Sequence, residues 1–259
     1  MRNILHMDLY RLRKSKFFIG CLIFVFGFSM IISLVTPLLT QAVSDLAGVS
    51  LGGPAAINFS EILSNPFVMF IPLVIFISAV SFSYLDFSGG YIKTIAGLAR
   101  RRIDLITSKF IVIALHNLLL MLAALIGCTL SAVIVRPIVF DAAIMAGIGD
   151  FFLKWLLVTA GTSILLFFTN GVKVKALGII AGVLIGSGML SLAYLGINSA
   201  VSATGIQGFD IMQYMPSQLM NTASVVNGTL VANAVIAGFV VLALFYTLTV
   251  ILFQKRDIK

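Results

Sequence analysis

Two polar side chains, His116 and Asn117, stand together inside a long apolar stretch of this 259-residue sequence. An imidazole could contact a substrate or carry a proton, and both side chains could form hydrogen bonds between helices. His6 is the second histidine, and Cys21 and Cys128 are the two cysteines. They are too few and too scattered for the usual metal sites or a disulfide framework. Two interpretations of His116 and Asn117 therefore stay open: a substrate or proton contact, and an interhelical contact.

The sequence contains no motif of a known catalytic centre. It has no G-x-x-x-x-G-K-[ST] loop for ATP phosphates, no H-E-x-x-H and no G-x-S-x-G. All nine carboxylates fall at the ends of apolar stretches or between them, whereas ion-coupled carriers place ionisable groups near mid-membrane. Asp150 and Lys154, four residues apart at the start of an apolar stretch, are expected to pair, with the lysine reaching toward the surface. The pattern predicts a chain that is not an enzyme and holds no cofactor.

The composition predicts that a lipid bilayer surrounds these residues. Apolar residues make up 60% of the chain and charged residues 10%, where a soluble domain carries roughly 25% charged residues. The mean hydropathy is +1.14. A helix needs about 20 apolar residues to cross a bilayer. We expect an all-α polytopic membrane protein, one transmembrane domain over 1–259, with spans at 17–38, 65–85, 110–135, 151–170, 177–197 and 231–253.

The distribution of Lys and Arg predicts the orientation of these six spans. Fifteen of the 17 Lys and Arg residues fall on one predicted side, and only Arg136 and Lys154 fall on the other. By the positive-inside rule both termini are cytoplasmic. Residues 1–16, with leucines at helical spacing, are predicted to form a helix in the cytoplasmic interface. The alternative is a continuous extension of the first span. The segment 86–109 is then cytoplasmic, and 198–229 is an outer loop with short helices before the last span.

Three glycines in the fifth predicted span indicate close helix packing. Gly178, Gly182 and Gly186 form two consecutive G-x-x-x-G steps, so one helix face carries no side chains there. Such a face lets another helix approach closely. The neighbour could belong to the same chain or to another protomer.

The cytoplasmic segment 86–109 is the most informative part of the sequence. Tyr91, Ile95 and Leu98 are spaced at i, i+4 and i+7, which gives a short helix an apolar stripe suited to a groove on a partner. An arginine run at 100–102 precedes the next span. The alternative is an interfacial loop whose arginines only set the topology.

This segment resembles the coupling loop of ABC-2 type transporter permeases, the membrane subunits of bacterial ABC exporters. The resemblance is carried by Asp86, then Gly-Tyr-Ile-Lys-Thr-Ile at 90–95, Gly-Leu-Ala-Arg at 97–100, and Lys109 at the start of a span. It is closest to the short permeases of antimicrobial-peptide immunity and export systems. The family usually has Glu at the position of Asp86. Arg100 matches the family arginine by its context, and Arg102 by its distance from Lys109.

The resemblance implies a permease subunit in the bacterial cell membrane that exports amphipathic peptides or other lipophilic molecules. Its partners would be a separate cytoplasmic ATPase, which holds ATP and Mg, and a second permease copy in a homodimer or heterodimer, with lipid around both and no nucleic acid. The residues implied in ATPase coupling are Asp86, Gly90, Tyr91, Ile92, Ile95, Leu98, Arg100 and Arg102. The alternative is a stand-alone secondary carrier or channel.

Overall fold

The protein is helical, as expected from its composition. The computed structural model describes residues 2–47, 56–65, 70–88, 102–204, 210–222, 224 and 228–255. The helices are α1 (Arg2–Lys14), α2 (Lys16–Ala47), α3 (Phe59–Ser64), α4 (Ile71–Ser88), α6 (Arg102–Val135), α7 (Ile144–Leu166), η1 (Phe167–Gly171), α8 (Lys175–Gly186), α9 (Leu190–Ala203), η2 (Ile211–Gln213), α10 (Pro216–Thr222) and α11 (Gly228–Lys255). Two short strands, β1 (Ile57–Asn58) and β2 (Ile138–Val139), pair in parallel. The all-α prediction is therefore confirmed.

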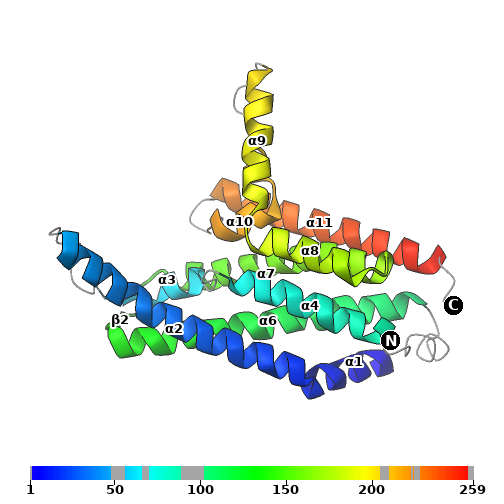
Figure 1. The fold of residues 1–259 in the computed structure, drawn as a ribbon, viewed down its shortest axis with the longest axis horizontal. Coiled ribbons are helices and arrows are strands. Elements are labelled where there is room, and N and C mark those ends of the chain that lie inside the picture. The colour runs from blue at the N-terminus through cyan, green and yellow to red at the C-terminus, as the bar shows by residue number, and fades with distance from the viewer. Residues whose placement is uncertain are drawn as a thin grey trace.

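Four described helical segments are long and apolar enough to cross a membrane: Lys16–Leu39, Ile103–Val135, Ile144–Gly171 and Leu230–Lys255. They overlap the first, third, fourth and sixth predicted spans, but the third and fourth begin earlier than the predicted 110 and 151. The second predicted span, 65–85, corresponds to the shorter apolar helix Ile71–Leu85. The main helices run alternately in opposite directions along the long axis of the body (Figure 1).

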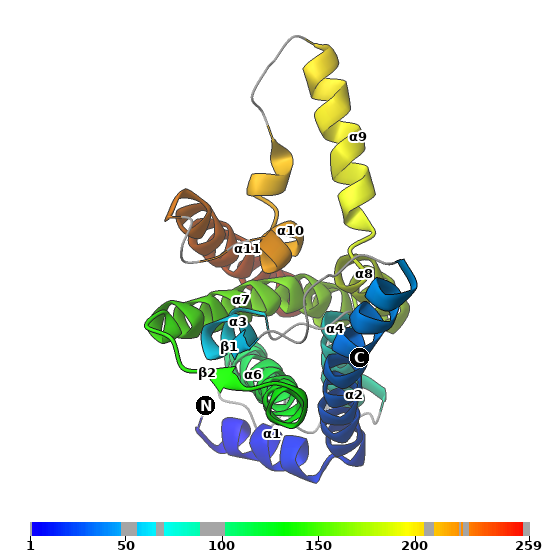
Figure 2. The same cartoon turned by 90° about the vertical axis from the view of Figure 1, so that its left-hand side faces the viewer.

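The fifth predicted span, 177–197, is not one straight helix. Instead, α8 and α9 meet at a bend of 70°, and α9 projects away from the other helices (Figure 2). The bend lies at Ser187–Met189, where Gly188 adopts a φ of +73° that favours glycine. Because α8 has only 12 residues, it rises about 18 Å, less than the thickness of the hydrocarbon layer.

The N-terminal helix α1 is separate from the first long helix, as expected for residues 1–16. The chain breaks at Ser15, whose Oγ accepts a 3.3 Å hydrogen bond from the Phe18 N–H and so caps α2. The leucine stripe of α1, formed by Leu5, Leu9 and Leu12, packs into the main apolar core rather than lying uncovered. Thus α1 is part of the helical body.

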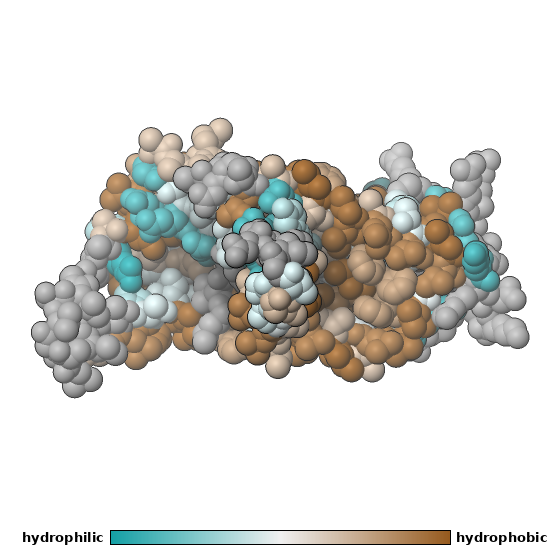
Figure 3. Space-filling view, turned by 90° about the horizontal axis from the view of Figure 1, so that it is seen from above, coloured by the Kyte–Doolittle hydropathy of each residue, from teal (hydrophilic) through white to brown (hydrophobic). Residues whose placement is uncertain are grey.

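The long helices contact one another closely where small residues remove side-chain bulk. A Cβ atom built on Gly127 of α6 would lie 2.6 Å from the Phe26 carbonyl oxygen of α2, so these two helices touch backbone to backbone. Large apolar side chains stay exposed along α2, α6 and α11. In Figure 3 hydrophobic residues form a broad belt over the body, with hydrophilic residues toward its ends. Such a belt is compatible with a surface that faces lipid.

The predicted outer loop 198–229 contains short helices in its described part. The Asn198 side chain joins α9 to η2: its Nδ2 donates to Asp210 Oδ1 (2.6 Å), and its Oδ1 accepts from the Ile211 N–H (3.0 Å). Pro216 is the first residue of α10, where its missing N–H breaks no helical hydrogen bond. The predicted helices before the last long helix are therefore present as η2 and α10.

Candidate functional site

The predicted coupling residues lie between the end of α4 and the start of α6. The backbone of Asp86 belongs to the last turn of α4, and Arg102 is the first residue of α6. The remaining predicted coupling positions, Gly90, Tyr91, Ile92, Ile95, Leu98 and Arg100, lie outside the described residues. Figure 1 shows the end of α4 and the start of α6 at the same end of the body, together with the end of α11.

The glycine face of α8 lies against α4 and η1 of the same chain. A Cβ on Gly178 would lie 2.6 Å from Thr169 Cγ2, and one on Gly186 would lie 2.6 Å from the Cα of Leu73. At Gly182 the nearest atom, Phe76 Cβ, would be at 3.4 Å, an ordinary contact. Of the two neighbours left open by the sequence, the structure shows a helix of the same chain.

His116 and Asn117 join three helices through hydrogen bonds. His116 Nε2 lies 3.2 Å from Ser78 Oγ of α4, and its Nδ1 lies 3.2 Å from Asn117 Oδ1. Asn117 Nδ2 donates to Thr162 Oγ1 of α7 at 3.1 Å. The two side chains are only 1% and 0% exposed. Phe18 and Phe82 cover the imidazole, with ring centroids 5.1 and 6.4 Å away.

These partners define the proton positions at the imidazole. Asn117 Oδ1 only accepts hydrogen bonds, so His116 Nδ1 carries the proton. In the neutral ring Nε2 is then an acceptor, and the single hydroxyl proton of Ser78 can point either to Nε2 or to the Ile75 carbonyl oxygen, which lies 2.9 Å from Ser78 Oγ. The contacts with Ser78 and Thr162 join α6 to α4 and α7, and the contact between His116 and Asn117 lies within α6. The geometry therefore fits the interhelical interpretation, and it presents no polar atom to a substrate.

A second polar cluster fixes α3 to α7, toward the opposite end of the body from the end of α4 and the start of α6 (Figure 1). Asp150 Oδ2 accepts hydrogen bonds from Ser64 Oγ (2.7 Å) and Ser224 Oγ (3.1 Å). Lys154 Nζ donates to Asn65 Oδ1 at 2.9 Å and to the Ser64 carbonyl oxygen. Both charged side chains are buried, at 2% and 3% exposure.

The expectation that Lys154 reaches toward the surface is wrong. The end of α3 covers the lysine, and the Ser64 carbonyl oxygen and Asn65 amide oxygen replace water around its ammonium group. Sequence reasoning missed Ser64 and Asn65 because they lie about 90 residues before Lys154. Several small polar residues, among them Ser60, Ser64 and Asn65, precede the second apolar stretch. The sequence does not indicate which distant residue their side chains contact.

The start of α3 is held by a carboxylate from outside the long helices. Asp141 Oδ2 accepts a 2.6 Å hydrogen bond from Ser60 Oγ, and Asp141 Oδ1 accepts from the Ser60 N–H at 3.4 Å. The hydroxyl of Ser60 stabilises the ionised form and lowers the pKa of Asp141 below its usual value. Asp141 thus takes the capping role at α3 that the Asn58 side chain does not fill.

A third polar contact lies at the basic end of the body, where the end of α1 and the start of α6 carry Arg11, Arg13, Lys14 and Lys109. Asp8 of α1, only 1% exposed, accepts a 2.7 Å hydrogen bond from Ser108 Oγ of α6 through its Oδ2. Its Oδ1 lies 3.7 Å from Lys109 Nζ. The carboxylate therefore fixes α1 to the start of α6. The sequence placed Asp8 in the N-terminal helix but did not indicate that this face is covered.

The arrangement of donors offers no metal site in the described part of the chain. Within it, no group of three or more His, Cys, Asp and Glu side chains is close enough to hold a metal ion.

Comparison of the chain with protein-family models, with curated proteins and with solved structures finds no match. The fold and its polar contacts define a helical protein with several long apolar helices, compatible with a membrane protein.

Proposed function

We propose that this chain is the membrane-spanning permease subunit of an ATP-driven ABC exporter of the ABC-2 type. Its cargo is an amphipathic peptide or another lipophilic molecule, and ATP hydrolysis takes place on a separate cytoplasmic subunit. The observation that carries the proposal is the order of residues from Asp86 to Lys109, which resembles the coupling loop of that family. ATP and Mg then belong to the partner subunit.

The arrangement of charges supports a cytoplasmic position for this segment. The ends of α1 and α11 and the starts of α6 and α8 carry Lys or Arg residues, and these ends gather on one side of the body (Figure 1). The opposite side carries Arg136 and the buried Lys154. The proposed topology has six crossings, which α2, α4, α6, α7, the bent α8–α9 pair and α11 would form, with both termini in the cytoplasm of a bacterial cell.

The proposed mechanism places the energy transfer at the segment between α4 and α6. ATP binding can drive transport only if the closed ATPase contacts the two membrane states with different free energies. Tyr91, Ile92, Ile95 and Leu98 supply the apolar contacts to the ATPase groove in this mechanism, and a second permease copy completes the pathway. Motion then reaches the core through α4, which packs on α8, and α6, which packs on α2 and α7.

The substitution Ile95→Asp tests this proposal. The aspartate would place a charge in the apolar contact, so the variant should insert into the membrane normally but lose ATPase stimulation and transport. The measurements are recovery of a P-loop ATPase with the tagged chain and the ATPase and export rates of the complex. Ile95→Leu is the matched control, because it keeps the apolar contact. Export by Ile95→Asp at the wild-type rate would contradict the proposal.

One observation favours the alternative, a stand-alone secondary carrier or channel. Asp150 and Lys154 are buried within the apolar helix α7, and buried ionisable groups often mark ion pathways. Their hydrogen bonds to Ser64, Asn65 and Ser224 give them a structural role in the described fold. Flux through liposomes that contain only this purified chain, driven by an ion gradient without any ATPase, would support the carrier.

A further inference from the structure

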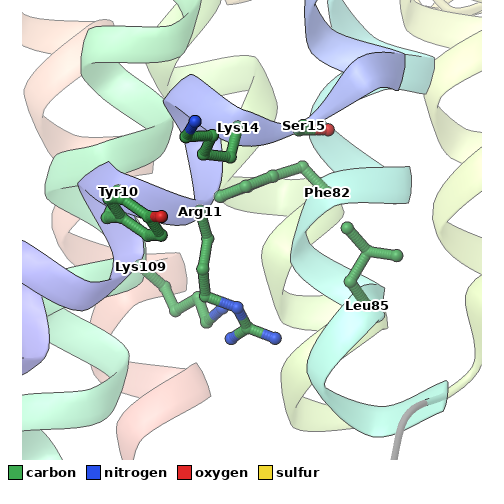
Figure 4. Close-up of a pocket in the computed structure, with 7 residues that line it drawn as sticks. All are labelled: Tyr10, Arg11, Lys14, Ser15, Phe82, Leu85 and Lys109. Atoms are coloured by element: carbon green, nitrogen blue, oxygen red, sulfur yellow. The ribbon is translucent and has the colours of Figure 1, made fainter.

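A pocket of about 260 Å³ lies where α1, α4 and α6 meet at the basic end of the body. Seven side chains line it: Tyr10, Arg11, Lys14, Ser15, Phe82, Leu85 and Lys109. Figure 4 shows that they come from three separate parts of the chain, with the lysine and arginine side chains on the α1 and α6 side and the apolar ones on α4. Complete ligand sites for drug-sized molecules occupy roughly 300–1,000 Å³, so this pocket suits one group of a larger molecule.

The polar side of the pocket is cationic. Arg11, Lys14 and Lys109 contribute positive charge, and none of the seven described side chains that line the pocket is acidic. Lys109 is held in place from behind, since its Nζ lies 3.7 Å from Asp8 Oδ1 and 5.5 Å from the centroid of the Phe82 ring. Cationic groups with N–H donors, together with hydroxyl groups such as those of Tyr10 and Ser15, are the usual partners of phosphate oxygens.

The other side of the pocket is apolar and open to the surroundings. Phe82 and Leu85 are one turn apart on α4, and Leu85 is exposed, as is Tyr10 on α1. A free phosphate ion gains nothing from an apolar wall. A phospholipid does, because its phosphate is covalently joined to acyl chains that would lie along Phe82 and Leu85.

We propose that this pocket binds the phosphate of an anionic phospholipid headgroup. Arg11 and Lys109, whose charged ends lie together in Figure 4, hold the phosphate oxygens, and Lys14, whose ammonium points away from them, adds positive charge nearby. Phe82 and Leu85 contact the adjoining part of the lipid. The bound lipid would fasten α1 to the end of α4 and the start of α6. This inference does not depend on the exporter function, because it uses only the pocket and a surrounding membrane.

The test compares lipids retained by the purified full-length chain, measured by native mass spectrometry in detergent. The probes are a phosphatidylglycerol, a phosphatidylcholine and inorganic phosphate. We expect tighter binding of the phosphatidylglycerol than of the phosphatidylcholine, and no displacement by millimolar phosphate. Arg11→Gln should weaken phosphatidylglycerol binding about fivefold, and Lys14→Gln should weaken it less, because the Lys14 ammonium points away from the other two cations. Arg13→Gln is the matched control, because Arg13 is an exposed cation of the same helix that does not line the pocket.

A second variant separates the two sources of phosphate. Leu85→Asn removes apolar wall but no charge, so it should weaken lipid binding and leave any binding of inorganic phosphate unchanged. Equal losses in Arg13→Gln and Arg11→Gln would overturn the proposal, since they would show only general attraction to a basic surface. Displacement of the lipid by inorganic phosphate would overturn it as well, because the pocket would then be a site for a free anion.

Discussion

The contact of α8 with η1 and α4 yields the sharpest prediction, because it rests on an interatomic distance. A Cβ on Gly178 would lie 2.6 Å from Thr169 Cγ2 and 3.3 Å from Val80 Cγ1. Thr169 cannot easily turn away, since its side chain is β-branched and its hydroxyl donates to the Leu165 carbonyl oxygen at 3.0 Å. Gly178→Ala must therefore push α8 away from its neighbours.

The magnitude follows from comparison with a second glycine of the same helix. Overpacking of this kind costs about 1–3 kcal/mol, while replacement of a helical glycine by alanine gains up to about 1 kcal/mol. Gly182→Ala shares that gain but makes only ordinary contacts, the nearest at 3.4 Å. The difference in unfolding free energy between the two variants therefore isolates the steric cost.

The assay is thermal unfolding of the two variants in mild detergent. One kcal/mol shifts the melting temperature of a chain of similar size by roughly 2–4 °C. Gly178→Ala should then melt about 2–12 °C below Gly182→Ala. Adding Thr169→Ser removes the clashing methyl group and keeps the hydroxyl, so it should restore most of the loss. Equal melting temperatures, or no rescue by Thr169→Ser, would refute close packing of α8 within one chain.

Three further predictions concern the polar contacts. Thr162→Val removes the acceptor of Asn117 Nδ2 and should cost about 1 kcal/mol in detergent unfolding, whereas Thr162→Ser should cost less. Ser60→Ala should raise the pKa of Asp141 toward its usual value in an NMR titration. Because the pKa of Asp141 is lowered in the folded chain, the contact stabilises α3 at pH values above the usual carboxyl pKa, and this stabilisation is lost as the pH falls through the lowered pKa. Lys154→Met removes two hydrogen bonds to the end of α3 and should destabilise the fold by about 1.5–3 kcal/mol, with Lys154→Arg as control; an unchanged melting temperature in the methionine variant would contradict the buried contact.

The expectations that the structure confirms concern local properties of the sequence, whereas those that it contradicts depend on contacts between residues distant in sequence. The helical class and the approximate positions of four long apolar helices are local properties of composition, and the sequence predicts them. The break between the N-terminal helix and the first long helix lies at Ser15, close to the predicted boundary after residue 16. The bend at Gly188 depends on a backbone conformation that a run of apolar residues with several glycines does not reveal. The buried state of Lys154 depends on α3, which precedes it by about 90 residues.

The sequence by itself determined which segments are apolar, where positive charge gathers, and that no familiar catalytic or metal motif is present, because these properties depend only on residue type and order. Tertiary structure decided which polar atoms meet. His116 and Asn117 contact Ser78 and Thr162, and Arg11 and Lys109 share a pocket with Phe82, only because helices distant in sequence pack together. A buried polar atom without a hydrogen-bond partner destabilises the fold, so the packed helices must supply such partners. No local sequence pattern specifies which distant residue the partner is.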